Sequence, residues 1–153
     1  NRIKFKGLVG EGRIGNEKIV LLKPQTYMNN SGESIREILN FYKETPENLI
    51  VFVDDIDIGF ANLKIKKGGS AGTHNGLKSI IYLIQSDKFP RIKIGVGKQY
   101  EGQDLADFVL SGFSKSDGAE IEKTIDLAVD AAIEIVENNV ESAMNKYNRK
   151  NSK

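Results

Sequence analysis

The sequence predicts an α/β domain with a mixed, twisted sheet and helices on both of its faces, in three layers. Strand-like segments interleave with amphipathic helical segments along the 153 residues, which is the pattern of layered α/β proteins. Residues 49–53 (LIVFV) are continuously apolar, and such a run indicates a central strand buried on both faces. No repeat, linker or low-complexity segment divides the chain, so we expect a single domain over residues 1–153.

The first third of the chain predicts a hairpin and a helix. Residues 2–7 and 17–23 are typical of strands, and three glycines between residues 10 and 15 mark the turn that joins them. We expect Asn30 or Ser31 to cap the helix that follows, and Pro46 to end it. The apolar face of that helix comprises Ile35, Ile38, Leu39 and Tyr42.

Beyond the apolar run, the pattern predicts two strands and four helices. The strands are expected at 63–67 and 91–97, and the helices at 77–84, 103–110, 117–138 and 140–148. The helix at 117–138 is long and amphipathic. Its apolar face comprises Ile121, Ile125, Ala128, Ala132 and Ile135.

The composition excludes several classes of protein. The chain has no cysteine, so it forms neither a disulfide framework nor a thiolate metal site. No apolar run is long enough to span a membrane and no signal peptide is visible, so we expect a cytoplasmic protein without a membrane partner. The net charge of +1 hides an asymmetry, because residues 62–98 carry +7 and residues 101–141 carry −9. A polyanion would bind the first region and be repelled by the second.

Residues 68–76 (GGSAGTHNG) combine four glycines with His74, the only histidine, and with the carboxamide of Asn75. Glycines let backbone N–H groups approach a ligand, and the start of a helix favours an anion or a carbonyl oxygen. A plain loop capped by Thr73 or Asn75 is the alternative that these residues leave open. The loop lacks the ending of a P-loop and the spacing of a dinucleotide fingerprint, which disfavours a nucleotide-binding function.

Two further segments carry polar side chains where ligands commonly bind. Asp54 follows the apolar strand at its carboxyl end, where its carboxylate can orient a histidine. Asp54, Asp55 and Asp57 suggest Mg²⁺, but no phosphate-binding partner accompanies them, so we expect no metal. Residues 24–32 (PQTYMNNSG) cluster amides with Tyr27, which suits a peptide backbone or a nucleotide, although a capped helix start with Tyr27 in the core explains them as well.

These segments follow one another in an order that resembles the bacterial-type peptidyl-tRNA hydrolase family. The motifs are KPQTYMN at 23–29, VDDID at 53–57 and GGSAGTHNGLKSI at 68–80, with RIKIGVG at 91–97 and DFVL at 107–110 also similar. The resemblance covers the chain from about Phe5 to Tyr147. It implies a monomer without cofactor or metal that cleaves the ester between peptide and tRNA in peptidyl-tRNA and so recycles tRNA during translation.

The resemblance also implies a catalytic constellation. A general-base histidine activates water, and Asp54 matches the aspartate that orients it. Asn29 and Asn75 match asparagines that hold the peptide backbone, the water or the carbonyl oxygen. Tyr27 matches an aromatic position in the cleft where Asn29, Asp54 and Asn75 are expected to meet. His74 matches a supporting residue and not the base.

Three basic residues match family positions that face the tRNA backbone: Lys64, Lys66 and Lys93. Their charge suits phosphate contact, although other members can carry arginine where this chain has Lys93, and arginine presents a different fork of donors. The alternative function is a non-catalytic RNA-binding module that keeps the fold and the basic band.

One part of the family pattern has no counterpart in the chain. The family opens with a strand, a Gly-Asn-Pro-Gly-like loop and a Thr-Arg-His-Asn-like segment that carries the general base, and nothing of this kind precedes Phe5. We therefore expect the domain to be N-terminally incomplete and to lack the base. Either the chain is a fragment, which its start at Asn1 favours, or it is a shortened member of the family without the base. The competing hypothesis makes His74 itself the base, provided that it reaches Asp54.

Overall fold

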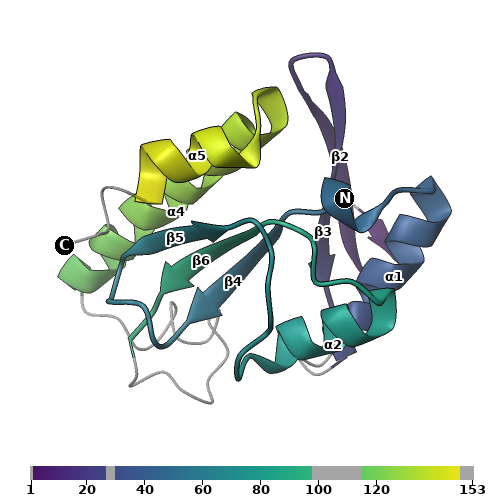
Figure 1. Ribbon diagram of the computed structural model, residues 1–153, viewed down its shortest axis with the longest axis horizontal. Helices are drawn as coiled ribbons and strands as arrows, with labels where there is room; N and C mark the ends of the chain where they lie inside the picture. The colour runs from purple at the N-terminus through teal and green to yellow at the C-terminus, as the bar shows by residue number, and fades with distance from the viewer. Residues whose placement is uncertain (1, 27–29, 98–114, 149–153) are drawn as a thin grey trace. The chain divides into compact units, whose positions relative to one another are not determined.

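The computed structural model describes residues 2–26, 30–97 and 115–148, which belong to two compact units (Figure 1). The first unit comprises Asn1–Leu49 and Gly68–Phe89, and the second comprises Ile50–Lys67 and Pro90–Lys153. In its described residues, each unit has a three-stranded sheet and two α-helices, and one of the two sheets is mixed. The predicted α/β class is therefore confirmed. The expectation of a single domain stays a prediction.

The sheet of the first unit is antiparallel, in the order β1-β2-β3. Its strands are β1 (Arg2–Lys4), β2 (Gly7–Ile14) and β3 (Glu17–Pro24). The predicted strand at 17–23 is confirmed as β3, but the hairpin partner is wrong: β3 pairs with β2, which lies where the sequence predicts the turn. Gly10 and Gly12 are inside β2, and the turn is at Gly15 and Asn16. The alternation of glycines with polar residues therefore indicates an exposed strand here, not a turn.

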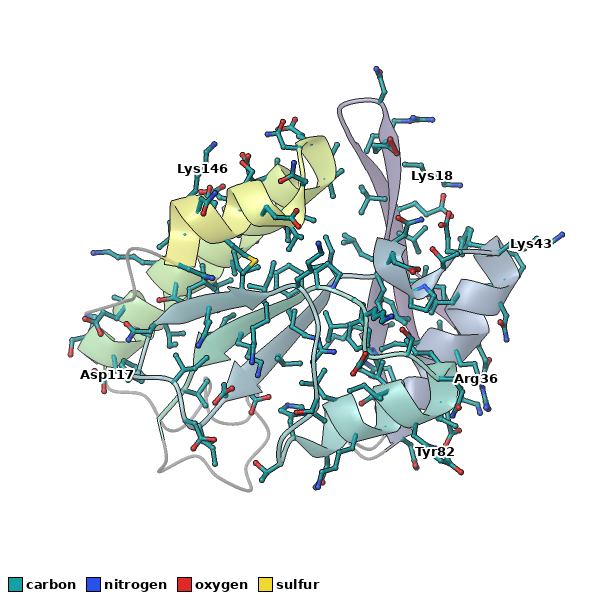
Figure 2. The ribbon with its side chains drawn as sticks, in the orientation of Figure 1. Lys18, Arg36, Lys43, Tyr82, Asp117 and Lys146 are labelled. Carbon is teal, nitrogen blue, oxygen red and sulfur yellow. The ribbon has the colours of Figure 1, made fainter. Side chains whose placement is uncertain are left out.

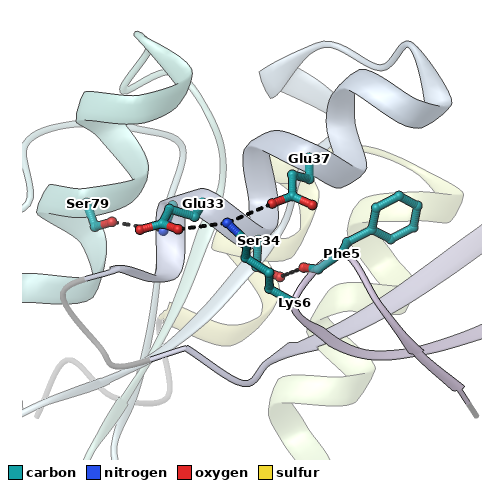
Figure 3. Close-up of polar contacts among 7 residues, drawn as sticks. Phe5, Lys6, Glu33, Ser34, Glu37 and Ser79 are labelled. Atoms are coloured by element: carbon teal, nitrogen blue, oxygen red, sulfur yellow. Dashed lines mark hydrogen bonds and ion pairs between the residues drawn. The ribbon is translucent and has the colours of Figure 1, made fainter.

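A tight turn at Phe5 and Lys6 divides the segment 2–7, which the sequence predicts to be one strand. Both residues have a positive φ, of 55° and 58°, as the two central residues of a type I′ hairpin turn do. Neither is a residue that adopts this conformation readily. Contacts from α1 hold the turn: Ser34 Oγ donates to the Phe5 carbonyl oxygen at 2.6 Å, and Lys6 Nζ lies 3.0 Å from Glu33 (Figure 3).

The helices of the first unit are α1 (Ser31–Tyr42) and α2 (Asn75–Ile84), and both agree with the sequence pattern. Asn30 is the N-cap residue of α1 but its side chain makes no capping bond, and α1 ends at Lys43 (φ 55°), ahead of Pro46, which begins the 3-10 helix η2 (Pro46–Asn48).

The two helices pack closely at Gly32. A Cβ on Gly32 would lie 2.3 Å from the Ser79 carbonyl oxygen, so only glycine fits there. Its N–H donates to the buried Ser79 Oγ at 2.9 Å (Figure 3). Tyr82, further along α2, is 74% exposed (Figure 2).

The sheet of the second unit has the order β4-β6-β5. Its strands are β4 (Val51–Asp55), β5 (Leu63–Lys66) and β6 (Arg91–Gly95), with β4 parallel and β5 antiparallel to β6. The prediction that the apolar run 49–53 forms the central strand is wrong. In the described sheet the central strand is β6, and Phe52 on β4 is 48% exposed. The continuous apolar run indicates burial, but it does not give the order of the strands.

Two helices, α4 (Lys115–Glu137) and α5 (Val140–Tyr147), cover one face of this sheet (Figure 1). The core between them comprises Leu63, Ile65, Ile92, Ile94, Ile121, Ala128, Ala131, Val140 and Ala143. Both helices agree with the sequence pattern, but the buried face of α4 contains Thr124 in place of Ile125, which is 38% exposed. Thr124 Oγ1 donates to the Ala61 carbonyl oxygen at 2.6 Å, and this bond accounts for its burial. The helix predicted at 103–110 lies outside the described residues.

Candidate active site and basic face

The carboxyl end of β4 carries Asp54 and Asp55, and the loop after it is fixed against β6. The Ala61 N–H donates to the Gly95 carbonyl oxygen and the Gly95 N–H donates to the Asn62 carbonyl oxygen, each at 2.9 Å. A Cβ on Gly95 would lie 2.0 Å from the Gly59 carbonyl oxygen, so the loop crosses β6 where no side chain fits. The backbone that presents the two aspartates is therefore held at both its strand and its loop.

Asp55 has a structural role at this strand end. Its Oδ1 accepts the Asp57 N–H at 2.7 Å, which stabilises the turn, and its Oδ2 lies 3.5 Å from Lys93 Nζ. The side chains of Asp55 and Lys93 are 19% and 14% exposed, so this ion pair is largely shielded from water. No group of three acidic or histidine side chains that could hold a metal ion occurs among the described residues.

The basic face of the second unit lies on β5 and β6. Lys64 is directly opposite Lys93, and Lys66 is directly opposite Arg91. Because residues opposite one another share a face of the sheet, these four cations form one group. Like charges in opposite positions repel one another, and the Asp55 carboxylate beside Lys93 offsets part of this repulsion. Lys64 and Lys66 are exposed, whereas Arg91 is completely buried.

Asp54 belongs to the other face of the same sheet. It lies beside Ile94 in the parallel register, and Ile94 belongs to the core covered by α4 and α5. Since side chains alternate along a strand, Asp54 and Asp55 leave β4 on opposite faces. The structure therefore gathers Lys64, Lys66 and Lys93 on one face of the sheet and places Asp54 on the other.

The glycine-rich loop is held in place within the first unit. Gly69 and Gly72 have φ of 122° and 59°, which side chains rarely allow. The Gly69 N–H donates to the Asp87 carbonyl oxygen at 3.0 Å. A Cβ on Gly68 would come within 2.9 Å of that same oxygen, so the loop and residue 87 approach closely.

His74 caps α2, in place of the expected Thr73 or Asn75. Its Nδ1 accepts the Leu77 N–H at 3.2 Å, and its backbone has the extended conformation of an N-cap residue. Imidazole Nδ1 occupies nearly the same place on its side chain as the amide oxygen of asparagine, so it can act as a capping acceptor. Asn75 is the first residue of α2 and is exposed.

The capping bond determines which nitrogen of His74 carries a proton. An Nδ1 that accepts a hydrogen bond has no proton, so in the neutral ring the proton is on Nε2. A general base needs a free lone pair to take a proton from water. His74 in this geometry has that lone pair only if it releases the Leu77 N–H.

Two of the expected site residues, Tyr27 and Asn29, lie outside the described residues. That Asn29, Asp54 and Asn75 meet in one cleft stays a prediction. Sequence reasoning did not select Arg91, the fourth cation of the basic face, although the alternation in RIK places it on the same side of the strand as Lys93.

The mixed sheet, its covering helices and the acids at its strand end define an α/β protein with one cationic sheet face. No helix in the described ranges has both the length and the apolar content to cross a bilayer. The family model for peptidyl-tRNA hydrolase matches residues 1–153. The chain is 60% identical over 150 residues to the peptidyl-tRNA hydrolase of Finegoldia magna, covering 98% of this chain and 79% of that protein.

Other relatives agree with this match. The chain is 52% identical to the peptidyl-tRNA hydrolase of Alkaliphilus metalliredigens, covering 97% of this chain and 80% of the relative. The crystal structure of the Acinetobacter baumannii peptidyl-tRNA hydrolase superposes with a TM-score of 0.82 at 32% identity, covering 99% of this chain and 76% of that one. The chain belongs to the peptidyl-tRNA hydrolase family. The family match gives no support to the expectation of a missing N-terminal segment, which stays a prediction.

Proposed function

We propose that this protein hydrolyses the ester bond between peptide and tRNA in peptidyl-tRNA and thereby returns tRNA to translation. Membership of the family and the relatives' shared name support the reaction. The observation that carries the RNA-binding part is the pairing of Lys64 with Lys93 on the basic face.

The proposed reaction is general-base hydrolysis. The oxygen of a water molecule bonds to the ester carbonyl carbon while a histidine takes the proton, and the bond to the ribose 3′ oxygen then breaks. The histidine passes its proton to that oxygen, so tRNA leaves with a free hydroxyl. The new carboxyl group of the peptide releases the second proton of the water to solvent and becomes a carboxylate. Asp54 orients the histidine and stabilises its protonated form, and Asn29 and Asn75 hold the water and the carbonyl oxygen.

We assign His74 a supporting role. Its capping bond to Leu77 occupies Nδ1, so the base is proposed to be a different histidine. The 153 residues contain one histidine. The 153-residue chain should therefore hydrolyse peptidyl-tRNA at least about 10²–10⁴-fold more slowly than a relative that has the base. Comparable turnover by this chain would instead make His74 the base.

The exposed lysines Lys64 and Lys66 are proposed to contact phosphates of the tRNA. Lys93 contributes its charge from beside Lys64, while its own ion pair with Asp55 keeps it in place. Tyr27 is proposed to line the cleft that receives the peptide end. Such contacts depend on charge and not on base sequence, so we expect binding of many tRNAs with a strong dependence on salt.

The variant Asp54→Asn, made in the full-length protein, distinguishes an effect on catalysis from an effect on tRNA binding. We expect kcat for an N-blocked aminoacyl-tRNA to fall by about 10²-fold or more, because the orienting carboxylate is removed. The dissociation constant for uncharged tRNA should stay near its original value, since Asp54 leaves the sheet on the face opposite the lysines. Unchanged kcat would refute the catalytic assignment of Asp54.

The resemblance also implies a monomeric, cytoplasmic enzyme with one domain and no cofactor, and these points belong to the same proposal. Sedimentation of the purified protein tests the first. A single species at the mass of one chain is expected, and a dimer at micromolar concentration would contradict it.

A further inference from the structure

At the outer edge of β5, a side chain bonds to the strand backbone at Ile65. Within the described sheet β5 pairs only with β6, so its other edge has no strand beside it. Asn148, which follows α5, bonds to that edge twice. The Ile65 N–H donates to Asn148 Oδ1 at 2.7 Å, and Asn148 Nδ2 donates to the Ile65 carbonyl oxygen at 2.9 Å.

These two bonds fix the orientation of the residues on either side of Ile65. Backbone groups in an antiparallel pair alternate between facing the partner strand and facing away. Because Ile65 turns both its groups toward Asn148, Lys64 and Lys66 turn theirs toward β6. The carboxamide thus takes the place that a further strand would occupy.

The same alternation determines on which face of the sheet each side chain of β5 lies. Ile65 is completely buried in the core below the sheet, and Lys64 and Lys66 are exposed on the opposite face. The basic face therefore depends on how firmly this short strand is held at both edges. On one edge it is held by β6, and on the other by Asn148.

The helix that carries Asn148 is itself anchored. Lys67 Nζ lies 2.6 Å from Glu141, and this hydrogen bond lowers the pKa of the Glu141 carboxyl. Glu134 of α4 accepts hydrogen bonds from Ser142 and from Lys146 at 2.9 Å (Lys146 is labelled in Figure 2). These contacts hold both the first and the last turn of α5, and Asn148 directly follows its last residue.

We propose that Asn148 is a positioning residue for tRNA binding, because it holds β5 so that Lys64 and Lys66 present their charges together. This inference rests on the proposed contact of those lysines with phosphate. Without the carboxamide, the edge of β5 frays, the two charges spread over more conformations, and ordering them on the RNA lowers the affinity.

The test compares Asn148→Ala with Ser142→Ala, which removes one hydrogen bond of α5 but keeps the Lys67–Glu141 and Lys146–Glu134 pairs and both bonds of Asn148. For Asn148→Ala we expect faster hydrogen exchange at the Ile65 amide, about three- to tenfold weaker tRNA binding and a shallower salt dependence. Ser142→Ala should leave tRNA binding and its salt dependence unchanged. If Asn148→Ala fails to fold, Asn148→Ser, whose hydroxyl is too short to bond to both groups, is used in its place.

A third variant, Lys64→Ala with Lys66→Ala, shows whether a negative result refutes the positioning role of Asn148 or the phosphate contacts of the lysines. If the lysine variant weakens tRNA binding while Asn148→Ala binds as the parent does, the positioning role is refuted. An Ile65 amide that exchanges as slowly in Asn148→Ala as in the parent refutes it as well. If the lysine variant itself binds tRNA normally, the proposed phosphate contacts are refuted. Weaker binding by both, with Ser142→Ala unaffected, supports the role of Asn148.

Discussion

Replacing Gly95 by Ala should destabilise the second unit strongly. The added Cβ would lie 2.0 Å from the Gly59 carbonyl oxygen and 2.7 Å from that of Ile58, whereas a comfortable contact for a methyl carbon is about 3.5 Å. The loop must therefore move by more than ~1 Å. Such a movement strains or breaks the two backbone hydrogen bonds that join Gly95 to Ala61 and Asn62.

The magnitude follows from these two effects. Two backbone hydrogen bonds contribute about 0.5–1.5 kcal/mol each, and overpacking costs about 1–3 kcal/mol. The free energy of unfolding should fall by about 2–6 kcal/mol and the melting temperature by about 4–24 °C. Circular dichroism during thermal and urea unfolding measures both.

Gly12→Ala is the matched control, because nothing lies within 4 Å of a Cβ built there. Its stability should change by less than about 0.5 kcal/mol. If Gly95→Ala were as stable as this control, the loop after Asp54 would not be held against β6, and that strand end would not be fixed in the way described above.

Three further predictions concern single side chains. Ser79→Ala removes the acceptor of the Gly32 N–H between α1 and α2, so urea unfolding should show a decrease in stability of about 1–3 kcal/mol; no decrease would mean that water replaces the hydroxyl. His74→Ala removes the cap of α2 and should cost about 1 kcal/mol in the same assay, whereas a rise in stability would contradict the capping role. Hydrogen bonds from Ser142, Lys146 and Asn138 lower the pKa of Glu134 from 4.5 to about 2. The ionised Glu134 carboxylate therefore stabilises the protein fully above about pH 4.5, and this stabilisation disappears as the pH falls toward 2. Glu134→Gln should destabilise the protein at about pH 7 and much less near pH 2. Equal destabilisation at the two pH values would contradict the lowered pKa.

The strands of the second unit show which features of the fold the sequence pattern predicts. Alternation in LKIK predicts that Lys64 and Lys66 share a face, and β5 has that form. The prediction of which strand lies in the middle is wrong. A short apolar run reports burial, but strand order depends on contacts between segments that are about 40 residues apart in sequence, as Val51 and Arg91 are in β4 and β6.

The turn at Phe5 and Lys6 could not be predicted for a related reason. Neither residue favours a positive φ, so the local signal indicates a continuous strand. The turn is held by Ser34, which is 29 residues away in sequence. Local propensity gives way here to a tertiary contact.

The candidate site is also predicted only in part from the sequence. The sequence identifies the loop before α2 as polar and helix-capping, but it does not show that His74 is the cap. Both neighbours are better-known capping residues, and only the geometry selects the imidazole. The sequence groups Asp55 with two other acids as a weak metal cluster, whereas the structure gives it an ion pair with Lys93.

The central claim is that the basic face formed by β5 and β6 binds the tRNA backbone, and the salt dependence of tRNA binding tests it most directly. The slope of log Kd against log salt should decrease by about 2 in the double variant Lys64→Ala, Lys66→Ala, because each lysine no longer neutralises a phosphate. The control Lys115→Ala, Lys123→Ala removes the same charge from α4 and should keep the original slope. Equal slopes in the parent protein and in the Lys64, Lys66 variant would contradict the claim.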